Sequence, residues 1–331
     1  MKIKKESLNN LITYAMLIAG FVIIMVLIAT GAASRHFTSM LVPICVNIIL
    51  ALSLNLVVGF LGELSLGHAG FMSVGAYAGC LFSIYTENIL SGNIRFPLAI
   101  LIGGLVAALF GFIIGIPVLR LKGDYLAIVT LAFGEILRSV IINLNFTGGA
   151  SGLKGTPQDS TFVIAFVLVI ITLFFITNLS NSKYGRAIMS LRDNRIASEA
   201  CGVNGNYYKL ATFVISAFFA GIAGVLYGHN FSILNASTFD YNKSIEILVI
   251  VVLGGMGSIR GSIISAIIIT VLPEILRFSS DYRMLIYSLV LIAMMIFSSS
   301  PTFASFRNSI GFKKKNMSKS ENGTDGGAIN E

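Results

Sequence analysis

The stretch from Asn181 to Lys209, NSKYGRAIMSLRDNRIASEACGVNGNYYK, is the longest polar segment in an otherwise apolar chain. It contains five lysine or arginine residues against Asp193 and Glu199. Apolar residues recur in it at helical spacing before Gly202 and the Asn204–Gly205 pair, which predicts short amphipathic helices that end there. A positively charged loop between two membrane spans is expected on the cytoplasmic side. It is either an ordinary solvated loop or a docking platform for a soluble partner.

The composition on both sides of this loop is that of a membrane protein. Hydrophobic residues make up 55% of the 331 residues, charged residues only 11%, and the mean hydropathy is +0.86. Soluble domains contain about 25% charged residues. Long apolar runs with scattered glycines favour membrane helices over the short alternating strands of a barrel. The net charge of +8 resides in loops and tails, and the three cysteines suggest no disulfide framework.

The fold class that follows is all-α, a polytopic membrane protein with about ten transmembrane helices. We expect a cytoplasmic N-terminus at residues 1–13, a transmembrane domain at 14–300 with the cytoplasmic loop 181–208, and a disordered cytoplasmic tail at 301–331. The first apolar run is too long for a usual signal sequence, so we interpret it as a retained span. Lysine and arginine concentrate on one side of this topology, which places both termini in the cytoplasm. The predicted spans are 14–33, 40–60, 64–86, 97–118, 124–144, 161–179, 209–229, 244–256, 261–277 and 283–300.

Two glycine-rich segments interrupt the apolar pattern, one from Asn55 to Gly79 and the other from Val252 to Gly261. Glycine permits both close helix packing and local unwinding of a helix. Unwound backbone at membrane depth is tolerated only where it is buried in protein or lines a cavity. The two segments occupy comparable places in spans two to five and seven to ten, so we expect broken or re-entrant helices in an inverted repeat.

Several charged residues fall inside or beside the predicted spans. Glu135 and Arg138 are three residues apart, so they share a helical face and can pair, either as a structural ion pair or in a gating role. Glu246 stands near the start of a short span, where Lys243 can offset it. The residues proposed for a translocation path are Asn55, Glu63, Ser65, His68, Glu135, Arg138, Glu246, Gly254, Gly255 and Gly257.

Glu63 and His68 lie within the first glycine-rich segment, on either side of its break. More than one role is open for each of them. A lone histidine among glycine and serine is more often a hydrogen-bonded packing residue than a ligand or a proton relay. Glu63 could bind a cation, alter substrate choice or face water.

Motifs for ATP hydrolysis and for metal or cofactor binding are missing from the sequence. No G-x-x-x-x-G-K-[ST] phosphate loop occurs, so we do not expect this chain to be an enzyme that hydrolyses ATP. No Cys/His cluster suits a metal, and Gly255-x-Gly257 does not follow a strand as a dinucleotide motif would. No cofactor is expected.

Five segments together resemble one family. They are SLGHAGFMSVGAYAG (65–79), LRLKGDYLAIVTLAFGEILR (119–138), TGGASGLKGTP (147–157), YGRAIMSLRDNRIASEACGV (184–203) and IEILVIVVLGGMGSIRG (245–261). In this order they are similar to the permease subunits of ATP-driven branched-chain amino-acid importers, across about residues 40–300. Each motif alone is weak, whereas five in register are fairly specific.

The resemblance implies a function and a set of partners. It implies an ATP-binding-cassette importer permease in the inner (plasma) membrane of a prokaryote, working by alternating access. The implied partners are a second, homologous permease subunit, two cytoplasmic ATP-binding subunits and an extracytoplasmic solute-binding protein. It makes the polar loop the segment that docks on the ATPase. The residues that carry this assignment are Gly185, Arg186, Arg192, Asp193, Asn194, Glu199, Ala200 and Gly202.

Three alternatives stay open at this point. Urea and short-amide permeases share much of the same pattern, and many relatives carry an uncharged residue where this chain has Glu63. An ion-coupled secondary transporter would use Glu63, His68, Glu135 or Glu246 as its coupling site. A channel would conduct only downhill.

Overall fold

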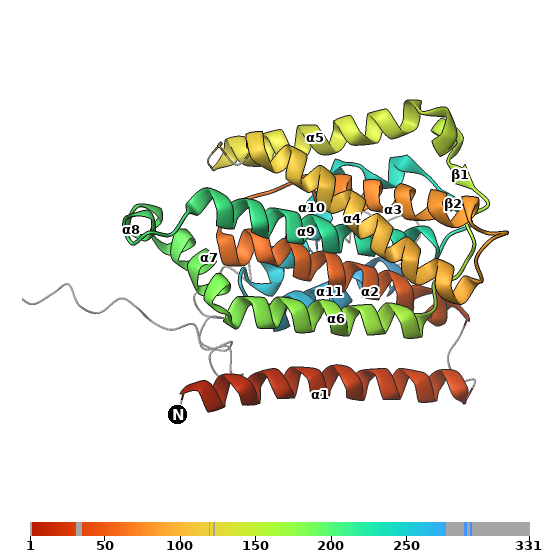
Figure 1. Cartoon of the computed structure of the whole chain (residues 1–331). Coiled ribbons are helices and arrows are strands. Elements are labelled where there is room, and N and C mark those ends of the chain that lie inside the picture. Colours follow the sequence, from red (N-terminus) through yellow and green to blue (C-terminus); the bar gives the residue numbers. More distant parts are fainter. Residues whose placement is uncertain are drawn as a thin grey trace, which may run out of the picture. The chain divides into compact units, whose positions relative to one another are not determined.

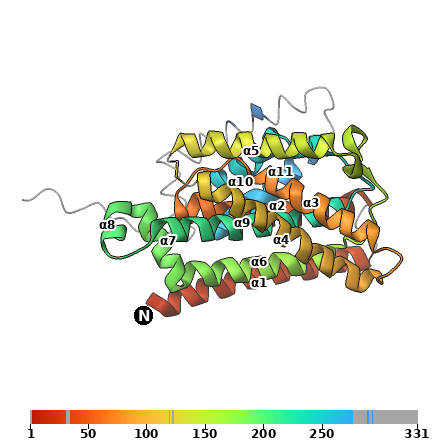
Figure 2. The same ribbon diagram turned by 45° about the horizontal axis from the view of Figure 1, so that its top comes forward.

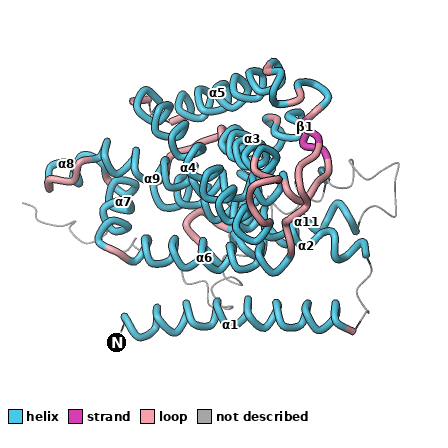
Figure 3. The backbone as a smooth tube through the Cα atoms, turned by 45° about the vertical axis from the view of Figure 1, so that its right-hand side comes forward, coloured by secondary structure: helices cyan, strands magenta, loops and turns pink. Residues whose placement is uncertain are grey.

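The computed structural model describes residues 2–30, 35–118, 120–121, 123–275, 288–289 and 292. The predicted tail at 301–331 and nearly all of the predicted span 283–300 lie outside the described residues. The residues up to Ser280 form one compact unit. Its described part is built almost entirely of helices, which confirms the all-α prediction (Figure 3).

The helices follow the predicted apolar runs closely, since each of the first nine predicted spans coincides with a described helix. The apolar helices are α1 (Lys2–Ala29), α2 (Arg35–Asn55), α3 (His68–Tyr85), α4 (Gly92–Val118), α5 (Asp124–Asn143), α6 (Phe162–Asn181), α9 (Gly205–Gly228), α10 (Tyr241–Gly254) and α11 (Ile259–Ile275). The polar loop adds α7 (Lys183–Asp193) and α8 (Arg195–Ala200).

Five segments of the described chain are long and apolar enough to cross a membrane. They are Phe37–Leu61, Gly92–Val118, Asp124–Asn143, Phe162–Asn181 and Gly205–Gly228. Helix α1 adds a shorter apolar segment, Tyr14–Ala29. Helices α3, α10 and α11 have only 18, 14 and 17 residues, as expected where interrupted helices share a crossing.

Helix α2 lies at the centre of the bundle, with 89% of its most apolar window buried. It packs against α6, α9, α10 and α11, while α3, α4 and α9 form a second tightly packed group (Figure 1). Helices α5 and α6 lie on opposite sides of these groups and are only 33% buried (Figure 2). Phe21 of α1 stacks on Phe162 and Phe166 of α6, with ring centroids 5.5 and 4.3 Å apart.

The first glycine-rich segment breaks the helix as predicted. The last turns of the α2 span form a π-helix, η1 (Leu56–Leu61), and Gly62 then adopts φ 80°, which a residue with a side chain rarely does. Residues 62–67 are not helical, so the predicted span 64–86 was wrong at its start and α3 begins at His68. The reason is a tertiary contact, because the Leu66 N–H donates to Thr130 Oγ1 of α5 at 3.0 Å rather than to a helical carbonyl.

The second glycine-rich segment separates α10 from α11. Gly255 and Gly257 have φ 86° and 82°, and α10 ends at Gly254. The backbones on either side of this turn touch, since a Cβ on Gly254 would lie 2.5 Å from the carbonyl carbon of Gly261. Glycine is therefore required at both positions for α10 and α11 to meet this closely.

The two ends of the bundle differ. At one end, strand β1 (Leu153–Lys154) pairs antiparallel with β2 (Ile233–Leu234), and Leu153 opposes Leu234. The short helices η2 (Asn145–Thr147), η3 (Gly149–Ser151) and η4 (Ala236–Phe239) flank these strands in the chain. At the other end lie α7 and α8 (Figures 1 and 3). The loop singled out in the sequence therefore lies at the end of the bundle opposite the two strands (Figure 1).

Candidate functional site

The polar loop is a folded unit in which every helix has its own N-cap. The side chain of Ser182 accepts from Gly185 N at 3.2 Å, Asn194 from Ala197 N at 3.0 Å, and Asn204 from Tyr207 N at 3.2 Å. Each cap satisfies one of the backbone donors that a helix start leaves free. The Asn204–Gly205 pair thus begins α9, in addition to ending the loop as predicted. Gly202 adopts φ 86° in the turn between α8 and α9.

Helix α7 is amphipathic and is packed on the bundle. Ile188 and Leu191 are 3% and 5% exposed. At its start, a Cβ on Gly185 would collide with the carbonyl oxygens of Leu179 and Ser180, so only glycine allows the sharp turn from α6 into α7. Arg186, in the next position, is exposed. These contacts fix α7 to the end of α6.

Helix α8 presents its apolar residue to the outside. Ile196 is 83% exposed, whereas Ile188 and Leu191, which recur with it at helical spacing in the sequence, are buried. The change of direction at Asn194 takes α8 away from the bundle (Figure 1). The sequence pattern alone therefore missed Ile196 as a surface residue.

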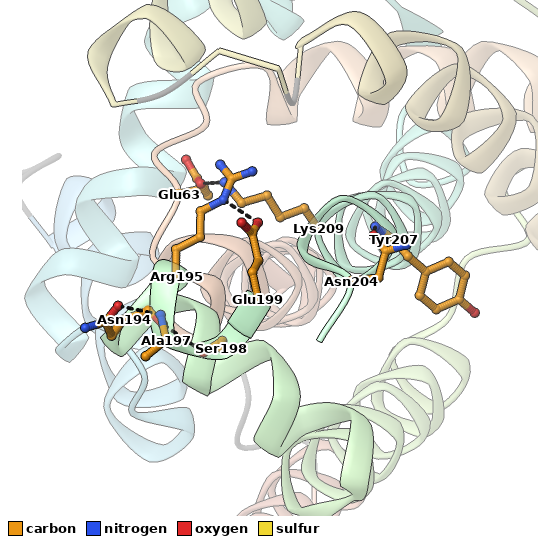
Figure 4. A network of polar contacts seen from close by, with 9 residues as sticks. All are labelled: Glu63, Asn194, Arg195, Ala197, Ser198, Glu199, Asn204, Tyr207 and Lys209. Atoms are coloured by element: carbon orange, nitrogen blue, oxygen red, sulfur yellow. Dashed lines mark hydrogen bonds and ion pairs between the residues drawn. The ribbon is translucent and has the colours of Figure 1, made fainter. Parts of the chain in front are cut away.

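An ion pair within α8 holds its short helix together. Arg195 Nε donates to Glu199 Oε1 at 2.8 Å across one turn, as Figure 4 shows. Ala200 is exposed in the same short helix, beside Glu199. The Glu199 carboxylate also lies against the start of α9, since a Cβ on Gly205 would be 2.6 Å from Glu199 Oε1, so this pair packs α8 onto α9.

Arg192, at the end of α7, points toward the bundle instead. Its Nη1 donates to the carbonyl oxygen of Gly59 in η1 at 2.9 Å, while Nη2 and Nε contact Asp193 Oδ1 at 3.0 and 3.1 Å. A Cβ on Gly62 would lie 2.5 Å from Arg192 Cγ, so the stem of Arg192 is packed against the αL turn. The polar loop and the first helix break are thus in direct contact.

The two helix breaks also meet each other. Asn55 Oδ1 accepts from Gly257 N at 2.8 Å, across 202 residues of sequence. A Cβ on Gly59 would collide with Gly257 N. The inverted-repeat prediction required two interrupted helices to come together, and they do so beside α7.

Glu63 follows the first break and forms an ion pair with Lys209 of α9 (Figure 4). The side chains are 14% and 4% exposed, so Glu63 does not face water. Lys209 was not among the predicted site residues. The sequence feature that could have pointed to Lys209 is its position, because it is a single cation at the edge of a predicted apolar span.

His68 is the first residue of α3 and is a buried, hydrogen-bonded residue. Its Nε2 lies 2.7 Å from Ser53 Oγ, which also contacts the Leu50 carbonyl at 2.9 Å. The next residue, Ala69, donates its N–H to Ser244 Oγ of α10 at 3.1 Å. These contacts support the interpretation of His68 as a hydrogen-bonded packing residue, because its ring pairs directly with Ser53 of α2.

Among the buried polar atoms of the described residues, Asn55 Nδ2 and Ser65 Oγ have no hydrogen-bond partner. Both residues belong to the predicted path, and they are 0% and 1% exposed. Buried polar groups are normally paired, so two orphans around one helix break are unusual.

The remaining predicted charges are paired at other places. Arg138 Nε donates to Glu135 Oε2 at 2.8 Å, on a partly exposed face of α5. Lys243 Nζ lies 3.1 Å from Glu246 Oε2 and 3.2 Å from Asn47 Oδ1 of α2. The structure thus brings Asn55, Gly257 and Arg192 together, whereas Glu135, Arg138 and Glu246 lie in separate pairs. Gly254 and Gly255 close the second break.

Metal binding finds no support in the described part of the chain, where no group of three His, Cys, Asp or Glu side chains is placed to hold an ion. The polar groups at the breaks are amide, hydroxyl and backbone groups beside one guanidinium. Such a set can bind and orient polar parts of a small molecule.

Comparison with known proteins shows the family to which the chain is similar. The family model described as the branched-chain amino acid transport system permease component matches residues 36–298. The high-affinity branched-chain amino acid transport system permease protein LivM of Escherichia coli K12 is 37% identical over 76% of this chain and 66% of its own length. A probable branched-chain amino acid permease LivM of Methanocaldococcus jannaschii is 27% identical over 71% of this chain and 81% of its own.

More distant relatives have other names. The ribose import permease protein RbsC of Haemophilus influenzae is 26% identical over 76% of this chain and 81% of its own length. No solved structure matches the chain significantly. The chain spans about two thirds of the length of the Escherichia coli protein. Since the matched region contains both helix breaks and the α7–α8 loop, this chain belongs to the branched-chain amino acid transport system permease family.

Proposed function

We propose that this chain is the membrane-spanning permease subunit of an ATP-binding-cassette importer for branched-chain amino acids. The observation that carries the proposal is the α7–α8 loop, which is firmly seated on the helix breaks and presents an exposed apolar residue, Ile196, outside the bundle. Protein contact sites combine apolar residues with a polar rim, and the loop carries both Ile196 and exposed charged residues. A loop with these two faces suits a segment that receives motion from a soluble subunit.

The proposed partners are a second, homologous permease, two cytoplasmic ATP-binding subunits and an extracytoplasmic solute-binding protein. The ATPase would dock on the loop, with both chain termini on the same cytoplasmic side. The coupling-loop residues we propose are Gly185, Arg186, Arg192, Asp193, Asn194, Glu199, Ala200 and Gly202, with Ile196 added from the structure. Among them Arg192 points inward to η1, whereas Arg186 and Ile196 are exposed and would face the ATPase.

The Escherichia coli and Methanocaldococcus relatives are named as branched-chain amino acid permeases, which favours these amino acids as substrates over urea or short amides. Such a substrate has an apolar side chain and two charged ends. Apolar helix walls would take the side chain, and polar groups and helix ends at the two breaks would meet the charges. The orphaned Asn55 Nδ2 and Ser65 Oγ are available donors for this role.

The mechanism we propose is alternating access. The solute-binding protein delivers substrate outside, ATP-driven closure of the ATPase moves the α7–α8 loop, and the helices rock so that the path opens inward. The acids of the ion-coupled alternative are engaged in ion pairs, namely Glu63 with Lys209, Glu135 with Arg138 and Glu246 with Lys243. That arrangement favours a structural role for them.

The deciding experiment is co-purification of the chain with the products of its neighbouring genes. We expect an ATPase to co-purify, and we expect Ile196→Glu or Arg186→Glu to release it while the permease stays in the membrane. Lys154→Glu, an exposed lysine at the opposite end, is the matched control and should keep the ATPase. Absence of any associated ATPase, or uptake of leucine that stops when ion gradients collapse with ATP maintained, would favour the ion-coupled transporter instead.

A further inference from the structure

We propose that Arg192 is a positioning residue that joins α7 to both helix breaks, so that α7, η1 and the turn at Gly257 move as one unit during transport. The inference rests on the proposed function and goes beyond docking. It states through which contact the motion of the loop reaches the transmembrane helices. Arg192 is a charged residue of the loop whose side chain donates a hydrogen bond to η1.

The first step is the bond from Arg192 Nη1 to the Gly59 carbonyl, 2.9 Å long. Gly59 lies near the end of η1, where carbonyl groups run out of partners within the helix. The end of a helix also carries partial negative charge, which a guanidinium complements. A charge-assisted bond of this kind is roughly twice as strong as a neutral one.

The second step is the contact between η1 and the other break. Gly59 leaves no room for a side chain beside Gly257 N, and Asn55 Oδ1 accepts from that same nitrogen at 2.8 Å. Gly257 is also close to Arg192, since a Cβ on Gly257 would lie 3.6 Å from Arg192 Nη1. The guanidinium thus sits where the loop and the two breaks meet.

The third step is stiffness. Contacts between glycine backbones leave no compressible side chain between η1 and the Gly257 turn, and close-packed elements transmit displacement as rigid bodies. Arg192 itself is packed through its stem on Gly62. A displacement of α7 is therefore passed on to both breaks rather than absorbed.

Lys183 offers a matched comparison on the same helix. It carries the same charge as Arg192, is exposed, and stands in the first turn of α7, away from η1. A residue that acts only through the charge of the loop would behave like Lys183. One that transmits motion would not.

The test uses the whole importer, purified with its ATPase and permease partners and reconstituted with the solute-binding protein, and measures leucine taken up per ATP hydrolysed. Arg192→Met keeps the unbranched stem and removes the donor. We expect it to keep the ATPase bound and to lower uptake per ATP about tenfold. Lys183→Met should match the wild type, and Arg192→Lys, which retains a charged donor, should recover most of the loss.

Two results would overturn the proposal. One is an uptake per ATP for Arg192→Met equal to that of Lys183→Met. The other is release of the ATPase by Arg192→Met, which would make Arg192 part of the docking surface. A wild-type complex that lacks an ATPase or leucine uptake would instead refute the proposed function, so the two failures are distinguishable.

Discussion

The carboxylate of Glu63 and the ammonium group of Lys209 form an ion pair in which both side chains are largely withdrawn from solvent, 14% and 4% exposed. Glu63 stands just after the first helix break and Lys209 in the second turn of α9. The segment that follows η1 is therefore held from two directions, by Lys209 through Glu63 and by Arg192 through Gly59. Arg192 and Lys209 both belong to the polar segment from Asn181 to Lys209.

Neutralising one member of the Glu63–Lys209 pair should cost more than neutralising both. Glu63→Gln leaves the Lys209 charge buried without a partner, a situation that costs about 3–5 kcal/mol of stability in buried pairs. Glu63→Gln combined with Lys209→Met removes both charges and should recover most of that loss. Thermal unfolding of the purified protein in detergent measures the difference. A double variant less stable than Glu63→Gln would show that the pair is not the source of the effect.

The Glu135–Arg138 pair on α5 should behave as a structural pair. Glu135→Gln leaves Arg138 without its ion-pair partner in a predicted span. Placing an unpaired charge near the centre of a membrane helix costs about 2.5–3.5 kcal/mol of insertion free energy. We expect reduced accumulation in the membrane, and near-normal accumulation when Arg138→Gln is added. Quantitative immunoblotting of membranes checks this. Normal accumulation of the double variant with complete loss of uptake would support the alternative gating role.

The backbone contact between α10 and α11 predicts a strong effect from a single methyl group. In Gly254→Ala the new Cβ would lie 2.5 Å from the carbonyl carbon of Gly261 and 2.5 Å from the backbone nitrogen of Ser262. One of the two helices must therefore shift. Overpacking of this kind costs about 1–3 kcal/mol. Gly20→Ala in α1, where a Cβ meets nothing within 4 Å, is the control and should leave the unfolding temperature unchanged or raise it. Equal unfolding temperatures for the two variants would refute the close contact.

The sequence predicted the helices well because long apolar runs have few alternatives in a membrane. Each of the first nine predicted runs falls on a helix, and glycine clusters marked the breaks. The start of α3 was misplaced by four residues, because the bond between Leu66 and Thr130 replaces helical pairing there. That bond joins residues 64 apart, and no local pattern records it.

The site was predicted in its parts and not in its connections. The polar loop and the two glycine-rich segments were identified separately, whereas the contact of Arg192 with Gly59 spans 133 residues and depends on the fold. Glu63 was found without its partner, since Lys209 lies 146 residues away. The spacing of Ile188, Leu191 and Ile196 predicted amphipathic helices, but it did not show that Ile196, which follows the turn at Asn194, is exposed while the other two are buried.

The contact between His68 and Ser53 predicts that uptake does not run on a proton relay through His68. The ring is 2% exposed and its Nε2 lies 2.7 Å from Ser53 Oγ, which has a further partner in the Leu50 carbonyl. His68→Leu should therefore lower stability by about 1–3 kcal/mol through the lost hydrogen bond. Ser53→Ala, which removes the same bond while leaving less empty space, should cost less. Leucine uptake driven by ATP in proteoliposomes should resist a protonophore in the wild type and in both variants. Protonophore-sensitive uptake in the wild type that becomes insensitive in His68→Leu would instead establish His68 as part of a proton path, and the ion-coupled mechanism with it.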